Sequence, residues 1–207
     1  VKNMAKMKKT STRIDMTAMC DVSFLLLSFF VLTSTAKVPE VHPVDLPNST
    51  KETKIPTSDI VTLSIDKDKV YFGLSGKDDK IDVLERMGKE YNIDFTKEEI
   101  EKFTFMENFG VDIRELKQLL AKPATELMKP EFHTNGIPYQ DSLNNQLSSW
   151  VRNARESTYA RKKDFVKVAI KGDAEEKFGT VKKVVAILQE QRQNRFYLVT
   201  GLRNSDF

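Results

Sequence analysis

The sequence predicts a single N-terminal transmembrane helix followed by a small α+β domain that carries a helical insertion. Residues 16–36 form a long apolar stretch, and the chain after it shows strand and helix patterns in the order β-β-α-β-α-β. The one cysteine, Cys20, lies inside the apolar stretch, so we expect the α+β domain to be held together by its core and not by disulfides. The expected parts are a basic tail at 1–15, the membrane helix at 16–36, an extended linker at 37–58 and the α+β domain at 59–207.

Charge is distributed unevenly along the chain. The tail carries five basic side chains and one acidic side chain, whereas the residues after Ala36 carry equal numbers of both signs. A neutral, well-mixed surface argues against a nucleic-acid-binding domain. The basic tail follows the positive-inside rule, so we expect residues 1–15 in the cytoplasm and residues 37–207 on the opposite side of the membrane.

Asp21 is the only charged residue between Asp15 and Lys37. A helix of about 20 residues spans a bilayer, and a carboxylate near its middle costs about 2.5–3.5 kcal/mol on insertion. Intramembrane acids usually carry a proton or an ion, and a low-dielectric setting favours the protonated form that this role requires. We therefore predict that Asp21 carries protons. The alternative is that it only hydrogen-bonds a neighbouring helix and fixes assembly.

Three hydroxyl side chains share a helix face with Asp21. Thr17 lies four residues before it, and Ser28 and Thr35 lie seven and fourteen residues after it. Such a polar stripe on an apolar helix needs a partner surface in the lipid bilayer. The three hydroxyls are candidates for a proton path, although hydroxyls in membrane helices more often bond their own backbone.

The N-terminal region also imitates a secretory signal. A basic segment, an apolar segment and the small residues Ser34, Thr35 and Ala36 together resemble a signal with its cleavage site. The alternative to an anchor is therefore a secreted domain after cleavage. Asp21 at the start of the apolar segment, and the length of that segment, favour a retained anchor.

The segment 37–58 is predicted to be extended and semi-rigid, because it contains Pro39, Pro43, Pro47 and Pro56. After it, residues 60–65 alternate as a strand, residues 66–69 make a turn and residues 70–72 return as a second strand.

Two helices and two strands are predicted at the end of the chain. A helix over 141–155 has Asp141 as its N-cap and Leu143, Leu147, Trp150, Val151 and Ala154 at helical spacing. Residues 165–170 and 196–200 are predicted strands. A helix over 175–191 is expected to bury Phe178, Val181, Val184, Val185 and Leu188. Both helices are expected on one face of the sheet.

Residues 77–138 form the predicted insertion. Thr96 and Glu99 form a capping box that opens one helix, and residues 112–121 form another. We expect the insertion to pack on the domain; the alternative is a docking surface for a partner. The side chains expected at this contact are Phe95, Phe103, Phe105, Met106 and Phe109. His133 and the Asn135-Gly136 pair are predicted to mark a turn.

The sequence carries no catalytic or metal-binding signature. His42 and His133, without a cysteine outside the apolar stretch, leave no plausible zinc site. A phosphate-binding glycine loop, Gly-x-Ser-x-Gly and His-Glu-x-x-His are all absent from the sequence. We therefore expect no enzyme activity, no metal and no cofactor.

The stretch 14–30 resembles the signature of the ExbD/TolR family of biopolymer-transport proteins. It reads Ile-Asp-Met-Thr-Ala-Met-Cys-Asp-Val-Ser-Phe-Leu-Leu-Leu-Ser-Phe-Phe, and Ala18 stands where the family usually has proline. Residues 166–181 resemble the strand, acidic loop and final helix of the family. The segment Val44, Asp45, Leu46 and Pro47 resembles the extended Leu-Pro segment of the family and is a candidate strand-swap or partner segment.

This resemblance implies a subunit of a proton-driven motor in the bacterial inner membrane, with the second domain in the periplasm. Two copies of its helix would lie inside a ring of a multi-helix ExbB or TolQ partner. Asp21 would take up and release protons, the coupling ion, and the motion would reach a TonB-like protein for outer-membrane transport. The alternatives are a TolR-like envelope-integrity subunit, a secretion-motor subunit, or an anchored periplasmic module that binds peptides or cell wall.

Overall fold

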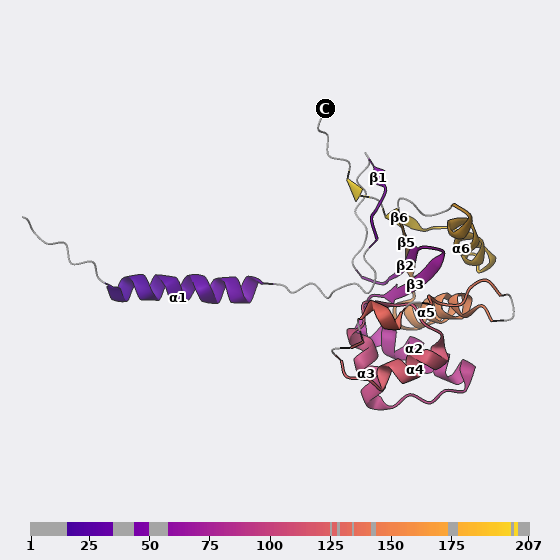
Figure 1. The fold of residues 1–207 in the computed structure, drawn as a ribbon, viewed down its shortest axis with the longest axis horizontal. Coiled ribbons are helices and arrows are strands. Elements are labelled where there is room, and N and C mark those ends of the chain that lie inside the picture. The colour runs from indigo at the N-terminus through magenta and orange to yellow at the C-terminus, as the bar shows by residue number, and fades with distance from the viewer. Residues whose placement is uncertain are drawn as a thin grey trace, which may run out of the picture. The chain divides into compact units, whose positions relative to one another are not determined.

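The computed structural model describes residues 16–34, 44–49, 58–124, 126–127, 129–133, 135–141, 144–173, 178–199 and 201–202. The chain forms two compact units, Val1–Val38 and Pro39–Phe207. The first unit contains helix α1 (Met16–Thr33), and the second contains a mixed sheet with helices (Figure 1). The predicted apolar N-terminal helix and mixed α+β architecture are both present.

The main sheet has five strands in the order β4-β3-β2-β5-β6. β2 (Ile60–Asp66) and β3 (Lys69–Leu74) are antiparallel, whereas β2 pairs in parallel with β5 (Lys167–Gly172). β6 (Tyr197–Val199) pairs in parallel with β5, and the short β4 (Asn108–Phe109) pairs with β3. The sequence patterns had not indicated β4.

A second, two-stranded sheet joins distant parts of the same unit. β1 (Asn48–Ser49) pairs in parallel with β7 (Gly201–Leu202). This pairing brings the segment that precedes β2 to the segment that follows β6.

The turn between β2 and β3 follows from its two central residues. Lys67 and Asp68 both have positive φ, 48° and 61°. Two such residues match the right-handed twist of the flanking strands in a two-residue hairpin. The predicted hairpin is confirmed, and its strands run further than predicted, to Asp66 and Leu74.

One face of the sheet forms the core. Val61, Leu63 and Ile65 alternate along β2 and are fully buried. The residues paired with them in β3 belong to the same cluster, as do Val168 and Ile170 of β5. Side chains from α2 (Lys77–Tyr91), α5 (Gln146–Lys162) and α6 (Phe178–Glu190) complete this cluster. Apolar burial on this face therefore joins these helices to the sheet.

The aromatic part of the core centres on Trp150 of α5. Its ring centroid lies 5.6 Å from that of Phe72, 6.1 Å from that of Phe103 and 4.9 Å from that of Phe109. Phe103 and Phe109 come from the predicted insertion, so these rings pack the insertion on the sheet.

The insertion contains α2, α3 (Lys97–Phe105), α4 (Ile113–Leu120) and a short 3₁₀ helix (Pro130–Phe132), and α2, α3 and α4 lie together in Figure 1. The predicted capping box is present: the Thr96 hydroxyl accepts from the Glu99 N–H, and the Glu99 carboxylate accepts from the Thr96 N–H. Asp112 caps α4 by accepting from the Arg114 N–H at 2.8 Å.

Phe105 was predicted to pack the insertion on the domain, and this prediction is wrong. It is 67% exposed, whereas Phe103 and Phe109 are buried, as is Met106. Phe105 lies two residues after Phe103, which places it on the opposite side of α3. Phe95 is partly buried against the core.

Two further details of the prediction are wrong. α5 begins at Gln146 and not after Asp141, because the Asn145 side chain accepts a hydrogen bond from the Ser148 N–H at 3.0 Å and forms the N-cap. Leu143 lies outside the described residues. Phe178 was predicted to be buried but is 77% exposed. It is the first residue of α6, whereas Val184 and Leu188, in later turns of the helix, are buried in the core.

Candidate functional site

Helix α1 is the one described helix that is long and apolar enough to cross a membrane. Its 18 residues extend about 27 Å, close to the roughly 30 Å hydrocarbon core of a bilayer. None of its residues is buried within this chain. Its apolar surface is therefore available to lipid or to another membrane helix.

Asp21 is the only charged side chain in α1. It is the sixth residue of the helix and lies in its second turn, so it is nearer the start of the described helix than its middle. Since α1 offers no cation to pair with this carboxylate, its charge must be met by a partner, by water or by a proton.

The hydroxyls of α1 bond to their own helix. Ser28 Oγ donates to the Leu25 carbonyl at 2.9 Å, and Ser23 Oγ and Thr33 Oγ1 donate to carbonyls four residues earlier at 2.8 Å. This arrangement satisfies these polar groups without a partner helix. It makes Ser28 a weaker candidate for a proton path than Asp21. Thr17 lies one turn before Asp21, and Thr35 lies outside the described residues.

The segment Val44, Asp45, Leu46 and Pro47 has no regular structure and leads directly into β1. Val44, Leu46 and Pro47 are half-buried, whereas Asp45 is exposed. The next two residues pair with β7, with Asn48 opposite Gly201. The segment thus leads into a strand pair, and its role as a partner segment stays a prediction.

His133 is a buried structural residue. Its Nδ1 accepts a hydrogen bond from the Gly110 N–H at 3.2 Å, and its Nε2 lies 2.7 Å from the Leu127 carbonyl oxygen. Because a backbone N–H can only donate, Nδ1 is unprotonated and Nε2 carries the proton that it donates to the carbonyl. Within the described ranges, no group of three or more His, Cys, Asp or Glu side chains could hold a metal ion.

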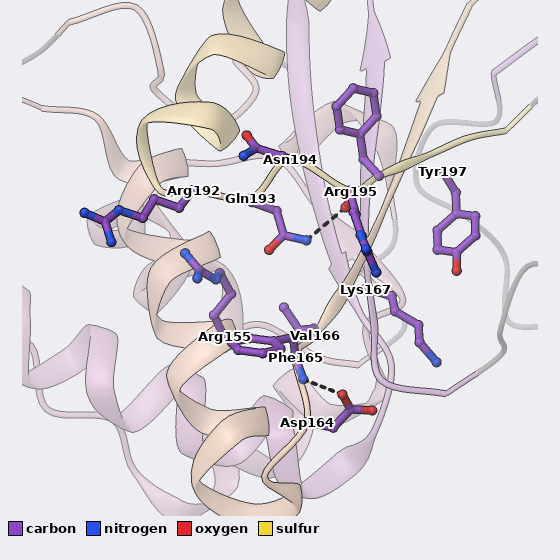
Figure 2. A pocket seen from close by; sticks show the side chains of 11 residues that line it. Arg155, Asp164, Phe165, Val166, Lys167, Arg192, Gln193, Asn194, Arg195 and Tyr197 are labelled. Carbon is purple, nitrogen blue, oxygen red and sulfur yellow. Dashed lines mark hydrogen bonds between the residues drawn. The ribbon is translucent and has the colours of Figure 1, made fainter.

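The α+β domain contains a pocket of about 820 Å³ where β5 and β6 begin (Figure 2). Its lining comes from residues 164–167, residues 192–197 and Arg155 of α5. These include four basic side chains and one acidic side chain, Asp164. Phe165 is 64% exposed and stacks on Tyr159 of α5, with ring centroids 5.7 Å apart. The pocket therefore combines cationic and apolar surface.

Sequence reasoning missed this pocket. Its residues come from a helix and from two separate connections, α5 to β5 and α6 to β6. The parallel pairing of β5 with β6 brings the two connections to the same end of the sheet. No local pattern marks residues that meet only through strand pairing.

Comparison with known proteins gave one match. A family model described as Biopolymer transport protein ExbD/TolR matches residues 7–202, nearly the whole chain. The match includes α1 with Asp21 and every strand of the main sheet. Neither a curated protein nor a solved structure matches the chain.

Proposed function

Because this chain belongs to the ExbD/TolR family of biopolymer transport proteins, we propose that it is the ExbD-like subunit of a proton-driven motor in the bacterial inner membrane. Family membership implies a non-enzymatic, energy-transducing subunit that works with membrane partners of the ExbB/TolQ type. Together with α1, it also indicates a single-pass membrane protein.

The proposal rests on the presence of Asp21 in α1. It is the only charged group on a helix that is otherwise apolar and exposed. Moving one elementary charge across about 100 mV yields roughly 2.3 kcal/mol. A single carboxylate captures this free energy if it is protonated from one side of the membrane and releases the proton to the other. Protons are the coupling ion, and no cofactor is needed.

The surroundings of α1 follow from the same chemistry. Its exposed phenylalanine and leucine side chains suit contact with lipid or with other apolar membrane helices, and Asp21 needs a site that shields it and admits water intermittently. Two copies of α1 inside a ring of the multi-helix partner would provide such a site. By the positive-inside rule, the basic tail favours an N-terminus in the cytoplasm and the α+β domain in the periplasm, where we propose that the domain acts on a TonB-like protein.

The decisive experiment replaces Asp21 by asparagine in cells that depend on this protein for outer-membrane transport. We expect Asp21→Asn to reach normal levels and to co-purify with the membrane partner while energised uptake is lost. Asp21→Glu keeps an ionisable carboxyl group and is expected to retain part of the activity. Full uptake together with an intact cell envelope in Asp21→Asn would refute the proton-carrying role.

Two readouts separate this proposal from its alternatives. Leakage of periplasmic proteins with normal uptake in Asp21→Asn would indicate a TolR-like role in envelope integrity. Replacement of α1 by a plain polyleucine helix tests the anchored binding module, which would remain active on an inert anchor. A motor subunit is expected to lose all activity in that replacement.

A further inference from the structure

We propose that the pocket where β5 and β6 begin binds a small organic acid, a carboxylate carried on an aromatic ring system. The proposal goes beyond the motor function and does not depend on the role of Asp21. It rests on three properties of the pocket: a half-buried cation without a carboxylate partner, exposed aromatic rings, and a wall that hydrogen bonds already hold in place.

Arg155 of α5 supplies the half-buried cation. Its Nη1 donates to the Gln191 carbonyl, and its buried Nε has no hydrogen-bond partner within the described part of the chain. Among the described residues, no carboxylate forms an ion pair with Arg155. A guanidinium that is partly withdrawn from water costs free energy unless an anion meets its charge. Its planar fork of donors suits a carboxylate in particular.

Three more basic side chains reinforce this charge. They are Lys167, Arg192 and Arg195, and none of them forms an ion pair within the described ranges. Asp164, the one acid in the lining, is exposed and accepts a hydrogen bond from the Phe165 N–H at 2.8 Å. The pocket therefore attracts an anion from solution.

Aromatic rings form the apolar part of the pocket. Phe165 is 64% exposed and stacks on Tyr159, with an angle of 29° between the ring planes. Phe196, on the other connection, is 37% exposed. The volume of about 820 Å³ lies within the range of about 300–1,000 Å³ that is usual for small-molecule pockets. An inorganic anion would leave most of this space and both phenylalanine rings unused, whereas an aromatic acid uses them together with the cations.

The wall formed by residues 191–195 is held before any ligand arrives. The Gln193 N–H donates to the Leu188 carbonyl at 2.9 Å, and its side-chain amide donates to the Arg195 carbonyl at 2.9 Å (Figure 2). The Gln191 amide donates to the carbonyl and the hydroxyl of Ser148 in α5, both at 2.7 Å. These bonds connect the segment after α6 to α5, so a ligand loses little affinity to ordering the site.

The test uses the full chain in nanodiscs of zwitterionic phosphatidylcholine, with empty nanodiscs subtracted. The probes are 2-naphthoate and its uncharged counterpart 2-naphthamide, titrated by saturation-transfer difference NMR. We expect saturable binding of naphthoate with a Kd of about 1 mM or below. Naphthamide is expected to bind at least about tenfold more weakly, because charge-assisted hydrogen bonds to the carboxylate are lost.

Variants of Arg155 and Phe165 separate the two halves of the site. Arg155→Gln is expected to weaken naphthoate by about tenfold and to leave naphthamide unchanged, whereas Arg155→Lys keeps the charge and retains part of the preference for naphthoate. Phe165→Ala, at an exposed position, is expected to weaken both probes equally. Lys182→Gln, at an exposed position on α6 outside the pocket, is the control and leaves binding unchanged.

A second variant keeps the test decisive if Arg155→Gln does not fold. Unchanged Trp150 fluorescence verifies folding, because Trp150 is fully buried in the core. Arg195→Gln replaces an exposed side chain and is expected to weaken naphthoate by about threefold. Asp21→Asn is expected to bind naphthoate normally, so this proposal and the motor proposal can fail separately.

Four results would overturn the proposal. The first is the absence of saturable naphthoate binding, and the second is equal binding of naphthoate and naphthamide. The third is unchanged naphthoate binding by the folded Arg155→Gln variant, or by Arg195→Gln where Arg155→Gln does not fold. The fourth is full displacement of naphthoate by an equal concentration of inorganic phosphate, which would assign the cations to small inorganic anions.

Discussion

The ring of Tyr71 occupies the space beside Gly110 that the Cβ of any other residue would need. A Cβ placed on Gly110 would lie 2.2 Å from Cδ1 of Tyr71. Tyr71 is 1% exposed and lies on β3, whereas Gly110 directly follows β4 in the insertion. This contact joins the insertion to the sheet, separately from the aromatic cluster around Trp150.

We predict that Gly110→Ala lowers the free energy of unfolding by about 1–3 kcal/mol, because a buried aromatic ring must move to admit the methyl group. Urea unfolding followed by the fluorescence of Trp150, the only tryptophan, measures the change. Gly172→Ala is the control, since no atom lies within 4 Å of an added Cβ there. Equal stability of the two variants would contradict the prediction.

The pKa of the Tyr71 phenol makes stability fall at alkaline pH. Burial and, to a smaller extent, the nearby Asp66 carboxylate together raise this pKa from 10.0 to about 12. The folded state therefore keeps a proton that the unfolded state loses, so this contribution is complete below pH 10 and is lost as the pH rises toward 12.

Titration of the tyrosinate absorbance checks this expectation. One of the five tyrosines is expected to ionise late in the folded protein, and Tyr71→Phe is expected to remove that late step. A single common transition for all five tyrosines in the folded protein would be inconsistent with a buried phenol at position 71.

Glu90 of α2 links this helix to α5. Its carboxylate accepts hydrogen bonds from Ser149 Oγ at 2.7 Å, Arg152 Nη2 at 2.6 Å and Asn153 Nδ2 at 2.9 Å. Burial opposes ionisation of Glu90, but these three hydrogen bonds and the charge of Arg152 outweigh burial and lower its pKa from the ordinary 4.5. Its stabilising contribution is therefore present above pH 4.5 and is lost as the pH falls through the lower folded value.

We predict that Glu90→Gln destabilises the protein by about 1–2 kcal/mol at neutral pH and makes unfolding less dependent on pH in the acid range. Urea unfolding at a series of pH values measures both effects. Glu85→Gln, at an exposed position on the same helix, is the matched control and is expected to change little. A Glu90→Gln variant with the stability and acid response of Glu85→Gln would exclude the linking role.

Lys80 closes the C-terminal end of α3. Its Nζ donates to the Thr104 carbonyl at 3.0 Å and to the Met106 carbonyl at 2.6 Å, and burial lowers its pKa despite the nearby Glu107 carboxylate. Lys80→Met is predicted to cost about 1–3 kcal/mol, because it leaves two carbonyls without this donor. Thermal unfolding, with Lys77→Met at an exposed position of α2 as control, tests the expectation.

The hydroxyls of α1 provide a contrast to Asp21. Since Ser28 already donates to the Leu25 carbonyl, Ser28→Ala is predicted to leave proton-driven uptake within about twofold of the unmodified protein. Parallel uptake assays on Ser28→Ala and Asp21→Asn distinguish a hydroxyl that only hydrogen-bonds within its own helix from a proton-carrying carboxylate. Loss of uptake in Ser28→Ala at normal protein levels would instead place Ser28 in the proton path.

Local chemistry explains which parts of the fold were predictable. The strand at 60–65, the capping box of Thr96 with Glu99 and the helix predicted at 112–121 each depend on residues close in sequence, and each is present in the structure. Asp141 is not the N-cap of α5, because Asn145, which directly precedes the helix, accepts the capping hydrogen bond from the Ser148 N–H. Phe105 and Phe178 were predicted to be buried because they belong to apolar clusters in the sequence. Phe105 is exposed on the side of α3 opposite Phe103, and Phe178 is exposed at the first position of α6.

Long-range pairing explains what was missed. The pairing of Asn48 with Gly201 and the parallel neighbours of β5 join segments that are far apart in the chain. The cationic pocket depends on the same pairing, so its residues carry no common local signal. For the proposed membrane site, by contrast, Asp21 is predicted from its apolar context alone, because lipid is a uniform solvent in which a single charge has a large free-energy cost.

The position of β2 has a consequence for biosynthesis. β2 lies at the centre of the sheet, yet one of its two neighbours is β5, with Ile60 opposite Lys167. The ribosome therefore delivers the central strand long before its partner, and β2 and β3 form an incomplete sheet with an open, apolar edge until β5 has been synthesised. Folding can finish only when nearly the whole polypeptide has been made, so premature termination leaves this edge exposed to aggregation and to proteases.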